Sequence, residues 1–176
     1  MTTDLRFPVG TYTKPTSLSP DARRTALDVI AKGPSRLREA VRGLSEAQLD
    51  TPYRPEGWTV RQVVHHVPDS HLNAYIRVKL ALTEDVPTVK PYDEAAWAKL
   101  EDSRSTPIEV SLALFEAVTD RWMRVLRAMS PSDFARKLNH PENGPMTLDD
   151  VVAMYAWHTN HHVAHITELR KRSGWA

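Results

Sequence analysis

The histidines are the residues of this chain whose type and spacing most clearly allow chemistry. Four of the eight fall within one short run, "YAWHTNHHVAH", at residues 155–165. They are His158, His161, His162 and His165. Such a concentration of imidazoles is explained by a metal site, by a cluster of general bases, or by chance on a polar surface.

Helical periodicity argues against the polar surface. At about 100° per residue, with His158 as zero, His162 lies at about +40°, His165 at about −20° and His161 at about −60°. Other residues on this face are Val151, Met154, Tyr155 and Leu169. The four imidazoles should therefore project from the inward side of one helix.

Buried imidazoles favour a metal ion as their partner. They are costly to bury unless their nitrogens are satisfied, and they repel one another when protonated. The i, i+4 spacing of His158 and His162 places two ring nitrogens one turn apart, as in the zinc pair of H-E-x-x-H proteases. Thr159 stands where the glutamate of that motif would be. The sequence thus supports metal binding but not a protease.

A third ligand must come from another part of the chain, because catalytic zinc commonly takes three protein ligands and keeps one position open. The segment "VVHHVPDSH" supplies His65, His66 and His71. His65 and His66 differ by about 100° around a helix, and periodicity prefers neither. We expect His71 to face solvent or a dimer partner.

Composition excludes several classes of function. The 176 residues carry 23 Lys and Arg against 22 Asp and Glu, a formal charge of +1. A chain with so little net charge does not attract nucleic acid or anionic lipid over long range, so we expect neither as a partner. Cysteine is absent, which excludes disulfides, thiolate zinc clusters and a cysteine nucleophile. With no targeting signal or apolar span recognisable, the expectation is a soluble cytoplasmic protein.

The elements that must position the histidines are predicted to be helices. We expect one domain over residues 1–176, with an extended arm at 1–17. The first helix should start at Pro20 after Ser19 and reach Leu44, with a kink or break at Gly33 and Pro34. The second should run from Thr59 to about Thr83 and bend at Pro68.

The second half of the chain predicts two further helices. A long connection at 84–105 could hold a short helix from Tyr92 to Leu100. Thr106, Pro107 and Glu109 indicate a capped start of the third helix. "LNHPENGPM" predicts a loop or small hairpin. Thr147 and Asp150 have capping-box spacing for a fourth helix that ends near Arg172, which completes an all-α four-helix bundle with long connections.

Three segments together resemble a known family. They are "LDTPYRPEGWTVRQVVHHVPDSHLNAYIRVKLALTE", "PYDEAAW" and "YAWHTNHHVAHITELRKRSGW". In this order they are similar to the YfiT-type branch of the DinB superfamily, described as metal-dependent hydrolases. The resemblance implies a DinB-like four-helix bundle, a homodimer, and a divalent metal held by three histidines, one from the second helix and two from the last.

Carried over residue by residue, the resemblance assigns the three ligands. The histidine eight positions after the Trp of "GWTV" is His66, and the H-x-x-x-H pair falls on His158 and His162. A pairing of His161 with His165 is the main rival. In the wider superfamily Arg-Gly-Gln often follows the second ligand, whereas His165 replaces that amide here, so we expect it to orient a ligand or a bound water.

The first functional hypothesis is hydrolysis of a small molecule. Three neutral histidines leave the ion its full charge, so a bound water would be acidified enough to attack an ester or amide. One divalent ion per chain is expected, zinc first and nickel second. Asp69, one turn from His66, and His165, one turn from His162, are the candidate acid and base residues.

Two alternatives stay open. The resemblance extends to bacillithiol-type S-transferases, in which the metal would activate the thiolate of a low-molecular-weight thiol. Lacking cysteine, this chain would take its sulfur from that cosubstrate. The other alternative is a non-catalytic binding module stabilised by the metal.

Simpler explanations suffice for the other conspicuous residues. The tryptophans are expected to pack between helices: Trp58, Trp97, Trp122 and Trp157. His140, in the predicted loop, should make local hydrogen bonds. Arg54 and Arg77 could bind an anionic substrate, but salt bridges are the simpler expectation for both.

Overall fold

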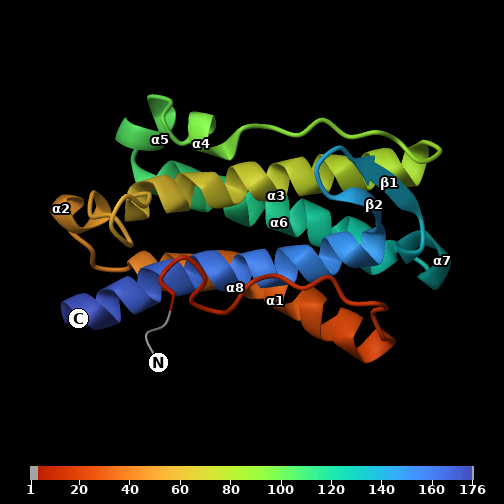
Figure 1. Cartoon of the computed structure of the whole chain (residues 1–176), viewed down its shortest axis with the longest axis horizontal. Coiled ribbons are helices and arrows are strands. Elements are labelled where there is room, and N and C mark those ends of the chain that lie inside the picture. Colours follow the sequence, from red (N-terminus) through yellow and green to blue (C-terminus); the bar gives the residue numbers. More distant parts are fainter. Residues whose placement is uncertain (1–3, 176) are drawn as a thin grey trace.

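Four long helices form the molecule in the computed structural model, which describes residues 4–175. They are α1 (Pro20–Val41), α3 (Val60–Thr83), α6 (Ile108–Ala128) and α8 (Leu148–Ser173). Helix α1 packs against α6 and α8, and α3 packs against the same two helices. Figure 1 shows the four helices side by side. The predicted all-α bundle is confirmed, and α3 and α8, which carry most of the histidines, are neighbours in it.

Local capping explains where most of these helices begin. The Ser19 side chain accepts a hydrogen bond from the Ala22 amide before α1, and Thr59 and Thr147 form capping boxes with Gln62 and Asp150. A cap of this kind satisfies amides that have no partner within the helix. The predicted capping box at Thr147 is therefore confirmed.

The predicted cap at Thr106 is wrong. Helix α6 begins only at Ile108, its N-cap residue is Pro107, and no side chain caps it. Thr106 instead ends a preceding short helix, with its amide bonded to the Asp102 carbonyl. One helix ends and the next begins within two residues here, which leaves Thr106 one position too early to cap.

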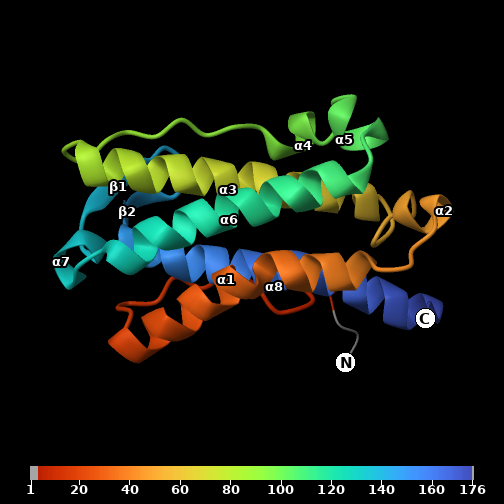
Figure 2. The same ribbon diagram turned by 180° about the vertical axis from the view of Figure 1, so that it is seen from behind.

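The internal prolines do not divide their helices. Helix α1 runs through Pro34 and α3 through Pro68, although Figure 2 shows α1 changing direction along its length. Gly33 is required by a close approach between helices. A Cβ at this position would lie 2.9 Å from Cζ of Phe115 in α6 and 3.1 Å from Cγ2 of Thr159 in α8.

The described connections contain six short elements, of which the sequence predicted only a helix near Tyr92 and a possible hairpin. They are α2 (Glu46–Leu49), α4 (Glu94–Trp97), α5 (Asp102–Ser105), α7 (Pro131–Phe134), β1 (Lys137–His140) and β2 (Gly144–Thr147). The helix expected from Tyr92 to Leu100 is thus only α4. The two antiparallel strands are the hairpin that the sequence allowed, with His140 opposite Gly144. Hydrogen bonds from Val89 to Asn139 and from Asn139 to Pro87 attach the long connection to this hairpin.

The core lies between the four helices, and the N-terminal arm lies outside it along α8 (Figure 1). Trp122 is fully buried, as predicted, but Trp97 is 39% exposed and packs on Tyr92. The indole N–H of Trp157 in α8 donates to the Gly10 carbonyl at 3.0 Å. Among residues 4–175, no helix has both the length and the apolar character needed to cross a membrane.

Candidate metal centre

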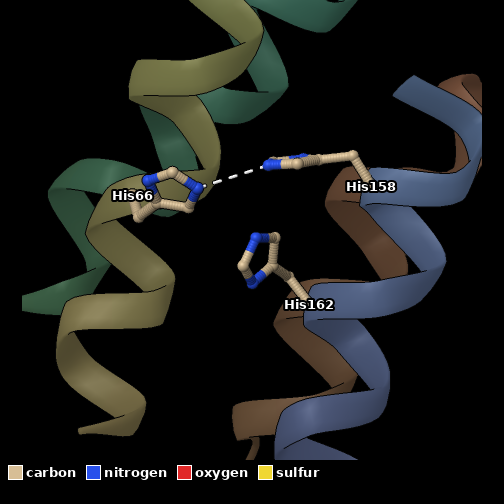
Figure 3. Close-up of side chains that lie close together, drawn as sticks. All are labelled: His66, His158 and His162. Carbon is tan, nitrogen blue, oxygen red and sulfur yellow. Dashed lines mark hydrogen bonds between the residues drawn. The ribbon is translucent and has the colours of Figure 1, made fainter. Parts of the chain in front are cut away.

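Three of the predicted ligands meet between α3 and α8. Nε2 of His66 lies 3.2 Å from Nε2 of His158, and His162 offers a third nitrogen, with all three within 4.8 Å of one another. Figure 3 shows the three rings converging from the two helices. Zinc–nitrogen bonds of about 2.0–2.1 Å put two tetrahedral ligands roughly 3.3 Å apart. The His66 to His158 separation therefore fits a shared metal ion, which these residues could hold.

The rival cluster shares one residue with the first. His161, His162 and His165 also bring ligand atoms within 4.8 Å. Nε2 of His165 is 3.1 Å from the Arg6 carbonyl in the arm, and because a carbonyl can only accept, this nitrogen carries the hydrogen. Nδ1 of His165 is then an acceptor, and it lies 3.4 Å from Nδ1 of His162.

This chain of contacts fixes the tautomer of His162. A neutral imidazole has one donor and one acceptor nitrogen. If Nδ1 of His162 donates to His165, its Nε2 keeps a free lone pair for the cluster with His66 and His158. The ring of His165 is also stacked on Tyr53, with centroids 3.8 Å apart. The arrangement favours the first cluster and places His165 where it can orient His162; the orienting role itself stays a prediction.

Burial keeps the candidate ligands neutral. It lowers the pKa of His66 to about 4, with a further contribution from His165. Burial followed by the charges of neighbouring histidines lowers the pKa of His158 and His162 well below the ordinary value. Metal ligands must be deprotonated. At neutral pH all three rings therefore have lone pairs available.

The structure separates the two adjacent histidines of α3. Nδ1 of His65 is 2.7 Å from the Ser111 hydroxyl, and its Nε2 is 3.1 Å from the Thr106 carbonyl. Both of its nitrogens are thus occupied on the α6 side of the helix. His66, the neighbouring residue, faces α8, which resolves the choice that periodicity left open.

The expectation for His71 is wrong. Its side chain is fully buried, with Nε2 3.4 Å from the Thr159 hydroxyl. Its ring packs edge-on against Phe115 and Trp122. Because both α6 and α8 pack against α3, this position, which would be exposed on a surface helix, lies in the core.

A cavity of about 400 Å³ opens beside the three rings. Its walls come from α3 and Trp58, from the segment at 92–95, from the hairpin and from α8: Trp58, His66, Ser70, Arg77, Tyr92, Glu94, Ala95, His140, Glu142, Asn143, Met154, Tyr155, Trp157, His158, His161 and His162. Ligand pockets typically have volumes of about 300–1,000 Å³. The candidate metal position is therefore accessible to a small molecule.

Neither predicted acid or base residue lines this cavity. Asp69 is rotated by about 60° from His66 around the helix, and burial, together with the charge of Asp102 in α5, raises its pKa to about 6. His165 lies behind His162, as described above. The structure thus does not bring Asp69 to the reacting side of the rings.

Sequence reasoning missed several cavity residues. The Tyr155 hydroxyl donates to the Ser70 carbonyl at 3.0 Å and lies 3.2 Å from the Ser70 hydroxyl. Tyr155 was on the predicted histidine face, so its periodicity was a usable signal. Tyr92 and Glu94 come from "PYDEAAW", which carried the resemblance but had no assigned role. His140 makes the expected local contacts, 3.3 Å from the Glu142 amide, and also lines the cavity.

The salt bridges expected for two arginines are not formed among residues 4–175. Arg54 donates to the Pro55 carbonyl at 2.9 Å, and Arg77 donates to the Lys90 carbonyl at 3.0 Å. The acidic residues that are paired with arginine lie elsewhere, as in the contact of Arg23 with Asp149. Neither guanidinium is therefore neutralised by a carboxylate of the described chain.

Comparison with known proteins identifies the family. Residues 30–166 match the DinB superfamily. The chain belongs to this superfamily. Its relatives include a Bacillus subtilis (strain 168) protein named "Putative metal-dependent hydrolase YfiT", 45% identical over 174 residues and 98% of both chains. A Bacillus cereus (strain 03BB102) protein named "Putative metal-dependent hydrolase" is 49% identical over 98% of this chain and 99% of the relative.

A solved DinB-type structure has the same fold. YfiT from Bacillus subtilis, described as "a probable metal-dependent hydrolase with an unusual four-helix bundle topology", superposes with a TM-score of 0.95 at 45% identity. The match covers 98% of this chain and 99% of the other. The similarity expected from the three sequence segments is confirmed over nearly the whole chain.

Proposed function

We propose that this DinB protein is a metal-dependent hydrolase of a small molecule, with one divalent ion held by His66, His158 and His162. The observation that carries the proposal is the 3.2 Å separation of the His66 and His158 Nε2 atoms beside His162. One N–H shared between His66 and His158 would satisfy these two nitrogens but would leave the nitrogen of His162 in the same space without a partner. A cation is the partner that all three neutral rings can bind at once, which supports a metal ion.

The chain's own residues would hold and orient the reactants. When bound, the ion would supply Lewis-acid chemistry by acidifying a water and polarising a substrate carbonyl. His165, held by the Arg6 carbonyl, would keep His162 in the ligating tautomer. Trp58 packs on His66, with ring centroids 4.8 Å apart, and shields that ligand. The buried Tyr155 hydroxyl stays protonated, since burial raises its pKa, and can position a polar substrate group.

Thiol transfer uses the same donor set. A cavity of about 400 Å³ lies near the lower end of the usual range for ligand pockets. Turnover screens with and without added low-molecular-weight thiol distinguish the two, since only the transferase requires the thiol.

Metal content is the direct test. Elemental mass spectrometry of untagged protein should find about one divalent ion per chain, with zinc expected before nickel. His158→Ala should lose the ion. His65→Gln is the matched control, because His65 is a buried histidine whose hydrogen bonds go to Ser111 and Thr106, and it should keep the ion.

The outcomes separate the hypotheses. Wild-type protein that is folded, metal-free and unable to take up zinc or nickel would overturn the proposal. A structural metal predicts that His158→Ala unfolds, whereas a catalytic ion on a stable bundle predicts lost activity with retained helicity by circular dichroism.

A further inference from the structure

A single lysine or arginine side chain of the described residues borders the cavity, at a distance from the three candidate metal ligands. Arg77 is the one lysine or arginine among its described lining residues. Its position on α3 is eleven residues after His66, which is about 16 Å along a helix and returns to nearly the same face. Side chains of a helix lean towards its N-terminus. The Arg77 guanidinium therefore leans back along the cavity towards His66.

Arg77 has hydrogen-bonding capacity that the described chain leaves unused. One terminal nitrogen donates to the Lys90 carbonyl at 3.0 Å. Its Nε and the Tyr92 hydroxyl, which also lines the cavity, are buried and make no hydrogen bond of good geometry, although the guanidinium lies near the Tyr155 hydroxyl and Tyr92 lies near Ser70. Buried polar groups are nearly always satisfied in native proteins. Two unsatisfied groups on the wall of one cavity indicate a polar ligand that meets both.

The charge of Arg77 acts within the cavity. Burial is the main cause of the raised pKa of Tyr155, and the charge of Arg77 opposes it. Burial and then the charge of Arg77 lower the pKa of His140. Tyr155 lies next to His158 in ring contact. Tyr155 therefore lies between a ligand group bound at Arg77 and the candidate metal position.

The balance of charge in the cavity selects the type of anion. Glu94 and Glu142 also line it, and both are exposed, so water screens them better than it screens the half-buried Arg77. One guanidinium facing two carboxylates suits a single negative charge better than a doubly charged phosphate. The Nε edge of a guanidinium also matches the planar geometry of a carboxylate.

We propose that Arg77, assisted by the Tyr92 hydroxyl, binds a carboxylate of the substrate. The substrates would then be small carboxylic acids whose reactive group lies at the three histidines and whose carboxylate lies towards the far end of the cavity. This inference rests on the proposed function for the position of the reaction, but the binding of carboxylate at Arg77 can be tested without a metal.

The first test uses metal-free protein. The ¹⁵N–¹H signal of the Arg77 Nε–H group, assigned by its loss in Arg77→Met, should shift saturably with hexanoate and stay unchanged with hexanamide. Calorimetry should show hexanoate binding weakened at least about tenfold in Arg77→Met, which corresponds to about 1.4 kcal/mol. Lys79→Met is the matched control, since it removes a cation from the same helix outside the cavity, and it should bind like wild type.

The second test uses zinc-loaded protein. Monohydroxamates of dicarboxylic acids, from succinic to suberic, present a metal-binding group and a carboxylate, and their terminal amides lack the charge. At the best length the acid should bind at least about tenfold more tightly than its amide to wild type and Lys79→Met. The preference should disappear in Arg77→Met.

Each failure points to a different error. Hydroxamates that bind neither as acids nor as amides would refute the histidine metal site, while the hexanoate titration would still decide the role of Arg77. Equal binding of acid and amide, together with an unresponsive Arg77 signal, would overturn the carboxylate inference. Tighter binding of a matched phosphonate than of the carboxylate would overturn it in favour of a phosphate-bearing substrate.

Discussion

At the scale of single residues, the candidate centre depends on how each imidazole nitrogen is partnered. His162 lies between two possible clusters, and its contact with His165 directs its Nε2 towards His66 and His158. The N-terminal arm takes part, because the Arg6 carbonyl fixes the hydrogen on His165. Residues that hold a ligand's second nitrogen typically affect metal affinity by about 10–100-fold.

Replacing His165 tests this orienting role. His165→Phe keeps a ring that can stack on Tyr53 but removes the acceptor for His162, so zinc affinity should fall by about 10–100-fold. His165→Gln restores an acceptor and should lose much less. Competition with a chelator of known affinity measures both, and circular dichroism checks the helices. Equal zinc affinity in His165→Phe and wild type would show that His162 is oriented by other contacts.

At the scale of elements, the close contact of α1 with α6 and α8 keeps the histidine-bearing helix in place. Gly33 allows this approach, since a Cβ would come within 2.9 Å of Phe115 and 3.1 Å of Thr159. Thr159 directly follows His158 in α8, and its hydroxyl contacts His71. The packing of α1 is thereby connected to the rings behind the candidate centre.

Gly33→Ala sets two effects against each other. Alanine is favoured over glycine in a helix by about 1 kcal/mol, whereas overpacking a core costs about 1–3 kcal/mol. Phe115 is fully buried and has little room to move, so we expect a net loss of about 1 kcal/mol in the free energy of unfolding. Urea denaturation measures this change in the free energy of unfolding. Gly43→Ala is unsuitable as a control, because Gly43 has a positive φ of 76° that alanine rarely adopts. A more stable Gly33→Ala protein would show that the helices can separate freely.

At the scale of the whole molecule, the burial of so many neutral histidines makes stability depend on pH. Burial lowers the pKa of His71 to about 3, with a smaller contribution from His66, against an ordinary value of 6.5. Below about pH 6.5 the unfolded chain takes up a proton at His71 that the folded protein refuses. The associated stability is therefore complete above pH 6.5 and is lost as the pH falls towards 3.

Metal-free protein should consequently lose stability in mild acid. His71 alone contributes about 1.4 kcal/mol per pH unit within this window. Urea unfolding at pH 7 and pH 5 should show that the free energy of unfolding falls as the pH is lowered. In His71→Gln this fall should be smaller, because the contribution of His71 to the slope is removed. The same pH dependence in both proteins would mean that His71 is protonated or exposed in the folded state.

The sequence by itself determined what depends on local periodicity and on family resemblance. Helix capping at Thr147 and the common face of the four α8 histidines follow from contacts within three or four residues, and the candidate triad was predicted by matching motifs. Tertiary packing decided the rest. His65 turned to α6 and His66 to α8, His71 became buried, Asp69 stayed outside the cavity, and Arg77 was left without a carboxylate. A helix has the same periodicity whatever packs against it, so only its neighbours determine which side chains meet, which are desolvated and which remain free for a ligand.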